Sequence, residues 1–303
     1  MLIPTRHSFF RHLRETIGPE RGAQTLARLM PLLPQTTENT LVLIVETCEA
    51  TLKVAGATLD AQTCSSVIST VLNIWLASPG DPMMGNAVCE LFSALSAIAS
   101  PAVQSVVLTE ALPSLAAVLR EIQADPFSPR AAAALEIVDS VFDGQPTPLG
   151  PGCFAAVAGA LFDTLAVTED RAIVQSGLHV ITTAVRKDVD QLLSWCVSSD
   201  LQCIDGSEEL TPPSRRNANG TSGLELVLAQ VAHLLQPGAS ESGGLFVGDL
   251  VLHLIRTASA SLGPVLPDLL KAFVTRLATA ETASFSQVRG FPHFICQLHT
   301  NRR

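Results

Sequence analysis

Tyrosine is absent from the 303-residue sequence, and aromatic residues of all kinds make up only 5% of it. The lysines and arginines are scattered, with no aromatic residues interleaved among them. Proteins that hold single-stranded nucleic acid stack its bases on aromatic side chains within a positively charged groove. The net charge of −9 also repels phosphate. We therefore expect no direct binding to nucleic acid or to an anionic membrane, whereas a basic protein partner is compatible with this charge.

The sequence also lacks the cysteine patterns of disulfide frameworks and zinc sites. Its seven cysteines are odd in number and widely spaced, and they form no C-x-x-C pair. Such usage is typical of reduced, buried thiols in a cytosolic or nuclear protein. The only spacing that approaches a metal site is His293, Cys296 and His299, and it has no fourth ligand. We expect neither a metal nor another cofactor.

Catalytic signatures are missing as well. The sequence contains no G-x-S-x-G, P-loop or H-E-x-x-H motif, and no glycine fingerprint that follows a strand. His179, His233 and His253 each lie in apolar runs with helical spacing, where a histidine usually packs at the core or its rim. No run of 18 or more consecutive apolar residues is present, so we expect no transmembrane helix. The protein is predicted not to be an enzyme.

Helical periodicity is the pattern that the sequence does contain. Apolar residues recur at steps of three and four in five clear stretches, namely 41–52, 67–75, 88–98, 224–235 and 266–277. Clusters of proline, glycine and serine separate these stretches and mark helix ends. Helices of this length, paired in units of about 40 residues, are typical of HEAT and armadillo repeats. The predicted fold is an all-α superhelix of this type, in which stacked repeats share one continuous core.

The pattern divides the chain into five segments. Residues 1–37 form a ragged, partly helical edge, and residues 38–199 form HEAT-like helical pairs. A polar loop at 200–222 separates these pairs from further repeats at 223–287, and an atypical tail follows at 288–303.

A short apolar phrase occurs twice in the sequence, as Leu112-Pro113-x-Leu and as Leu266-Pro267-x-Leu. Proline is tolerated in the first turn of a helix, where its missing N–H would have no partner. We therefore expect each phrase to start the second helix of a repeat.

Residues 223–287 resemble the C-terminal part of importin-β-type nuclear transport receptors, in the branch that imports histones. The segments that carry this resemblance are, in order, "LLQP", "FVGDLVLHLIRTA", "LGPVLPDLLKAFVTRL" and "TAETASF". Residues 81–119 resemble the preceding repeats more loosely. The resemblance implies a HEAT solenoid that shuttles between cytoplasm and nucleus. The resemblance also implies basic cargo, such as core histones, bound on the concave face of the solenoid. The other implied partners are nuclear pore proteins and the small GTPase Ran, whose GTP form releases the cargo.

The resemblance departs from the family in two respects. Members of this family are much longer, and their amino-terminal repeats, which make the main Ran contacts, have no counterpart here. The tail at 288–303 is also interrupted by Gly290 and Pro292 where the family continues with an apolar helix. We therefore expect a C-terminal fragment of such a receptor.

Two groups of polar residues are candidates for partner binding. The polar loop carries four carboxylates that could face a basic partner, or could simply be solvated: Asp200, Asp205, Glu208 and Glu209. If the second Leu-Pro helix lines the binding face, its polar positions Asp268, Lys271 and Arg276 are candidates, the alternative being a solvated helix face. The alternative function is a HEAT scaffold subunit of another complex, for example one that organises a phosphatase or chromatin.

Overall fold

The computed structural model covers the whole chain and describes residues 17–36, 38–77, 80–121, 129–196, 222–235, 243–263 and 266–279. The chain divides into two compact units, unit 1 at Met1–Thr164 and unit 2 at Leu165–Arg303. The described residues are helical or in connections, and the only strand-like pairing among them is a single bridge between Cys196 and Ser222. The predicted all-α class is therefore confirmed.

The elements of unit 1 are α2 (Pro19–Leu29), η1 (Met30–Gln35), α3 (Glu38–Ala55), η2 (Gly56–Thr58), α4 (Ala61–Ala77), α5 (Pro82–Ser96), α6 (Pro101–Val106), the π-helical turn η3 (Val107–Ala111), α7 (Leu112–Arg120), α8 (Pro129–Gly144) and most of α9 (Cys153–Val167). Unit 2 contains α10 (Arg171–Ser194), α11 (Gly223–Leu234), α12 (Gly243–Leu262) and α13 (Leu266–Thr279). Each of the five periodic stretches lies in one of these helices, although α5 ends before Ile98 and α11 ends before Leu235.

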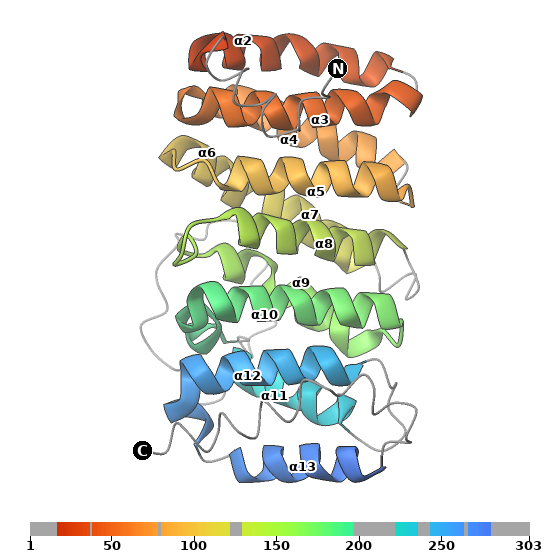
Figure 1. Ribbon diagram of the computed structural model, residues 1–303, viewed down its shortest axis with the longest axis vertical. Coiled ribbons are helices and arrows are strands. Elements are labelled where there is room, and N and C mark those ends of the chain that lie inside the picture. Colours follow the sequence, from red (N-terminus) through yellow and green to blue (C-terminus); the bar gives the residue numbers. More distant parts are fainter. Residues whose placement is uncertain are drawn as a thin grey trace, which may run out of the picture. The chain divides into compact units, whose positions relative to one another are not determined.

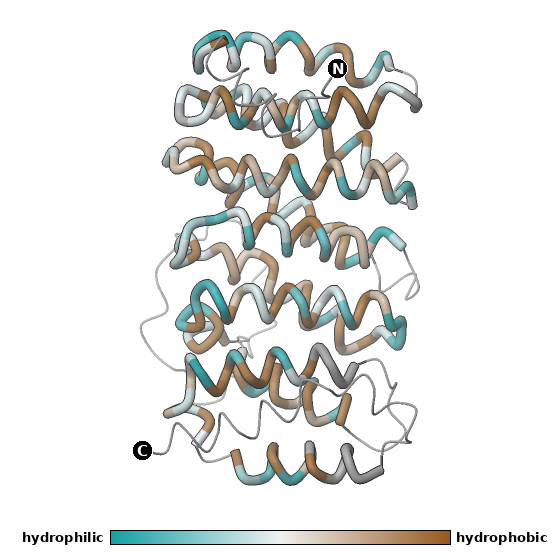
Figure 2. The backbone as a smooth tube through the Cα atoms, in the orientation of Figure 1, coloured by the Kyte–Doolittle hydropathy of each residue, from teal (hydrophilic) through white to brown (hydrophobic). Residues whose placement is uncertain are grey.

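The helices of unit 1 form two layers (Figure 1). In the first layer, α2, α3, α5 and α8 lie side by side, and each packs on the next. Behind them, η1, α4 and the joined helices α6 and α7 form the second layer. Apolar and polar residues alternate along each helix in Figure 2, as an amphipathic helix requires when only one side is covered.

The core of unit 1 lies between these layers. Its largest fully buried side chains are Trp75, Phe92, Phe142 and Phe154. Removing an apolar side chain of this size from water contributes roughly 1.5–3 kcal/mol to stability. Every member of the predicted stripe at 67–75 is buried, which explains why α4 forms where the periodicity predicts it.

Close backbone approach sets the packing of α5 against α8. A Cβ atom on Gly144 would lie 2.3 Å from the carbonyl oxygen of Ser93 and 2.8 Å from its Cα. Only glycine fits at this crossing without displacement of one helix. The start of α5 is fixed in turn by Asp81, whose Oδ1 accepts hydrogen bonds from the backbone of Met83 at 2.9 Å and of Met84 at 3.4 Å.

The first Leu-Pro phrase behaves differently from expectation. Leu112 does begin α7, but α7 is not a separate helix, because α6, η3 and α7 run on as one helix from Pro101 to Arg120. Pro113 has no N–H for the helical ladder, and its ring would clash with the carbonyl four residues earlier. The turn before it widens to π-helical spacing, with the N–H of Leu112 bonded to the carbonyl of Val107, and the helix continues. The second phrase begins α13 at Leu266.

By length and composition alone, the joined helix from Pro101 to Arg120 could cross a membrane, and it is the one such helix in the described part of the chain. Half of its apolar window is buried inside the structure, and it packs against α4 and α8. That environment is typical of a core helix.

Unit 2 is built mainly on the packing of α10 against α12, with α11 contacting both. Each of the two long helices contains one residue with non-helical backbone angles, Asp188 in α10 and Ala258 in α12. The start of α11 is a capping box, in which Ser222 and Glu225 each bond the other's backbone N–H, at 3.2 and 2.8 Å. The rest of the predicted polar loop at 200–222 and the tail at 288–303 lie outside the described residues.

Candidate functional site on unit 1

Unit 1 carries most of the negative charge of the chain. Its described residues include thirteen acidic and only five basic side chains, a formal charge of −8, and the whole unit has a formal charge of −7 in a protein of −9. Negative charge on one structural unit steers positively charged partners toward it. The positions of its carboxylates on the layers are therefore relevant to function.

Three of these carboxylates act on one thiol, that of Cys89 on α5. The pKa of this thiol is raised to about 11, mainly by burial and also by the charges of Glu136, Asp139 and Glu90, whereas a hydrogen bond with the Ser140 side chain lowers it. Glu136 and Asp139 of α8 therefore act on a side chain of α5 across the contact between the two helices.

Two further carboxylates extend this group onto α3. Gly22 of α2 lies against Val54 and Ala55, so that flank of α3 faces α2. Glu46 and Glu49 lie on the opposite flank, because successive helical residues turn by about 100°, and that flank faces α5. On α5, the exposed Glu90 follows Cys89 and lies about 100° from it around the helix axis.

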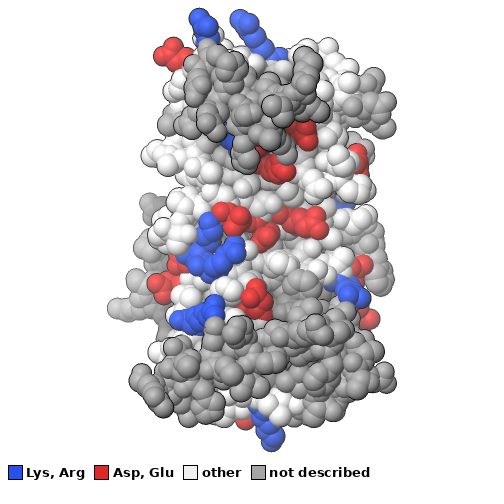
Figure 3. Space-filling view, viewed as in Figure 1, with Lys and Arg blue, Asp and Glu red and all other residues white. Residues whose placement is uncertain are grey.

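We call the five carboxylates of Glu46, Glu49, Glu90, Glu136 and Asp139 the acidic face. Figure 3 shows acidic side chains gathered on this side of the molecule over α5 and α8 and toward α3. Four of the five are exposed or half-buried, while Glu49 is buried. The face thus crosses three consecutive helices of the first layer.

The chemistry of the acidic face is that of hydrogen-bond acceptors with negative charge. Ionised carboxylates accept strong, charge-assisted hydrogen bonds from guanidinium and ammonium groups, and the fork of arginine can bond both oxygens at once. Within the described ranges, no three histidine, cysteine, aspartate or glutamate side chains are arranged to hold a metal ion. Guanidinium and ammonium groups are chemical groups that such a face can bind.

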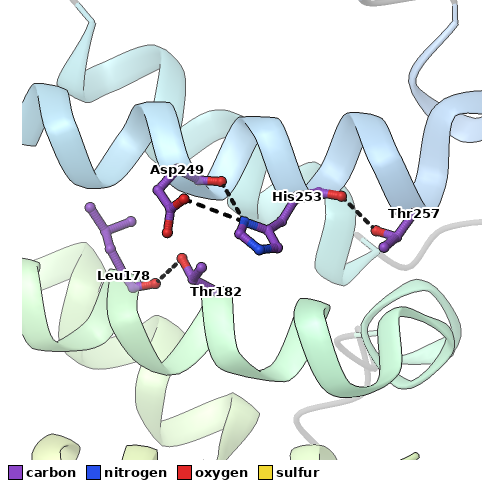
Figure 4. Close-up of polar contacts among 5 residues, drawn as sticks. All are labelled: Leu178, Thr182, Asp249, His253 and Thr257. Atoms are coloured by element: carbon purple, nitrogen blue, oxygen red, sulfur yellow. Dashed lines mark hydrogen bonds and ion pairs between the residues drawn. The ribbon is translucent and has the colours of Figure 1, made fainter. Parts of the chain in front are cut away.

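A second polar group lies on unit 2, between α10 and α12 (Figure 4). The Nδ1 atom of His253 is 2.9 Å from the carbonyl oxygen of Asp249 and 3.5 Å from its carboxylate Oδ1. Both oxygens accept, so the proton of the imidazole belongs on Nδ1. Thr182 points toward the histidine from α10, but its hydroxyl donates to the carbonyl of Leu178. Each of these bonds stays within a single helix, α10 or α12, so none of them links the two helices.

The candidates from the sequence are only partly placed by the structure. Asp268 and Lys271 are exposed and lie one turn apart on α13. Arg276 belongs to the same helix, but its side chain is outside the described residues. Also outside the described residues are the four carboxylates of the polar loop, which are Asp200, Asp205, Glu208 and Glu209. The same is true of the spaced residues His293, Cys296 and His299. Their roles stay predictions.

The acidic face itself was missed by sequence reasoning. Each of its carboxylates looks like a routine polar position of an amphipathic helix. The available signal was that α3, α5 and α8 each carry carboxylates near their middle, which in side-by-side helices come to similar heights. Among the described cysteines, Cys48, Cys64 and Cys153 are buried, whereas Cys89 and Cys196 are half-buried.

In a scan of the sequence against known protein families, no family model matches this chain.

Proposed function

We propose that this chain is a non-enzymatic receptor that binds a basic protein segment on the acidic face of unit 1. In this proposal the stacked helices are part of a HEAT-type superhelix. The side-by-side packing of α2, α3, α5 and α8 supports this arrangement, because each first-layer helix covers the next, as successive repeats of such an array do.

The observation that carries the proposal is the acidic face, which crosses α3, α5 and α8 in a unit whose described residues have a formal charge of −8. A surface of this kind attracts a basic segment at long range and then fixes it by several charge-assisted hydrogen bonds. Exposed charge pairs are screened by salt, so such binding is strong at low ionic strength and weakens as salt is added.

In its most specific form, the proposal is that the protein imports basic cargo into the nucleus. The resemblance of residues 223–287 to importin-β-type receptors supports this form, and the negative charge suits core histones as cargo. Ran in its GTP form would release the cargo, nuclear pore proteins would bind during transit, and the protein would shuttle between cytoplasm and nucleus. The proposed binding surface belongs to α3, α5 and α8 of unit 1, whereas the Leu-Pro helix α13 belongs to unit 2.

A binding experiment with a core histone dimer tests the proposal. The full chain is titrated with fluorescently labelled dimer at low and moderate salt, and then the complex is challenged with Ran loaded with a GTP analogue. Saturable binding that weakens with salt supports the receptor, and displacement by Ran supports nuclear import. Binding that ignores Ran favours the scaffold alternative. No saturable binding at either salt concentration contradicts the receptor.

A further inference from the structure

Glu49 is the one member of the acidic face that is buried. Its side chain is 2% exposed, and its Oε1 pairs with the ammonium group of Lys53, one turn later on α3. Its second oxygen, Oε2, is buried and has no hydrogen-bond partner. A buried acceptor without a donor is unfavourable, and most proteins avoid it. The carboxylate therefore has unused capacity for one more cationic donor.

The unpaired carboxylate oxygen of Glu49 belongs to the side of α3 that faces α5. The residue lies on the flank of α3 away from α2, together with Glu46 and Lys53. On α5, Glu90 is exposed. Glu49 is thus the buried member of the acidic face, and the other four carboxylates are exposed or half-buried.

Lys53 differs from Glu49 in its freedom to move. Its side chain is 53% exposed, so the ammonium group can turn into water while its long stem rotates. Pairs in which one partner is well exposed contribute little, because water solvates the charge almost as well. Exchange of Lys53 for a cation of a partner therefore requires no unfolding of α3.

Resting on the proposed function, we propose that Glu49 anchors one arginine side chain of the bound basic segment, and that Lys53 occupies its place in the free protein. In the complex, Lys53 moves into solvent and the incoming guanidinium bonds both oxygens of Glu49. A guanidinium matches a carboxylate through two parallel hydrogen bonds, whereas an ammonium acts as a point charge. The face therefore selects arginine-rich over lysine-rich segments of equal charge.

Four variants of the full chain test this exchange, with an arginine-rich peptide and a lysine-rich peptide of equal length and charge as probes. Lys53→Met removes the competing cation, and Arg130→Met removes one exposed positive charge elsewhere on unit 1. Glu49→Gln removes the anchor, and Glu121→Gln removes one exposed negative charge elsewhere. Affinity is measured by fluorescence anisotropy, and circular dichroism reports folding.

We expect Lys53→Met to tighten arginine-rich binding about 10-fold, and Glu49→Gln to weaken it about 10-fold, which is 1.4 kcal/mol in each case. The two control variants change affinity by no more than about 2-fold, since they act only through screened charge. The preference for arginine over lysine disappears in Glu49→Gln. If Lys53→Met does not fold, the comparison of Glu49→Gln with Glu121→Gln decides.

The failure of this inference is separable from that of the proposed function. If the wild-type protein binds both peptides but each test variant behaves like its control, Glu49 is not an anchor, and the acidic face stands. If the wild-type protein binds neither peptide, both proposals are overturned.

Discussion

The hydroxyl of Ser65 on α4 donates a 2.6 Å hydrogen bond to the carboxylate of Glu110, which lies in the π-helical turn between α6 and α7. The bond joins residues 45 positions apart and is partly buried. It fixes the widened turn to its neighbour in the second layer. The same carboxylate contributes, after burial itself, to the raised pKa of Cys64.

Ser65→Ala is expected to lower the free energy of unfolding by about 1–2 kcal/mol, because the variant deletes a hydrogen bond to a charged group. Urea unfolding followed by circular dichroism measures the change. Ser66→Ala is the matched control, since Ser66 is the exposed neighbour, and it should change stability by less than about 0.5 kcal/mol. Equal effects of the two substitutions would show that the Ser65–Glu110 bond contributes nothing.

Gly144→Ala is expected to destabilise the protein by about 1–3 kcal/mol, since the added methyl group would overlap the backbone of Ser93 and force α8 away from α5. Gly159→Ala in α9 is the control, because nothing lies within 4 Å of its Cβ position. That change should stabilise by about 0.5–1 kcal/mol through helix propensity. Thermal unfolding of both variants checks the prediction, and a stable Gly144→Ala protein would contradict the close contact.

The buried thiol of Cys64 predicts a loss of stability at alkaline pH. Burial raises its pKa from 9.0 to about 12, so the folded protein keeps the proton over a pH range where the unfolded chain loses it. The stabilising contribution is therefore complete below about pH 9 and declines as pH rises toward 12, by up to about 1.4 kcal/mol per pH unit.

Urea unfolding at pH 8 and pH 10 measures this effect. The difference in stability between wild type and Cys64→Ala should shrink at the higher pH. The difference between wild type and Val67→Ala should not change, because Val67 is equally buried but does not titrate. A constant difference for Cys64→Ala would show that its thiol titrates normally.

Much of the fold was predictable because local signals agreed with the packing. The stripe of Val67, Ile68, Val71, Leu72 and Trp75 is buried throughout, as its spacing predicts. The π-helical turn was not predictable in the same way. Proline at position 113 is compatible with the start of a new helix or with a widened turn inside a continuous helix. The structure has the widened turn, and Glu110 and its neighbours in that turn contact α4.

The acidic face was only weakly indicated by the sequence, through carboxylates near the middle of three helices. Glu90 and Glu136 are 46 positions apart, and neither has a distinctive local motif. That both charges act on the Cys89 thiol depends on the register of α5 against α8, which the close approach of Gly144 to Ser93 helps to set. A carboxylate on a helix surface is usually solvated, so only the assembled layer distinguishes a shared face from separate charges.

The most direct test of the central claim compares two triple variants of the full chain for binding to a core histone dimer. One neutralises the acidic face by Glu90→Gln, Glu136→Gln and Asp139→Asn. The other removes the same charge from exposed positions elsewhere on unit 1, by Glu20→Gln, Glu121→Gln and Asp163→Asn. The account predicts that the first loses about 10-fold or more in affinity at low salt and the second about 2-fold. Equal losses in both, or no loss in the first, would contradict it.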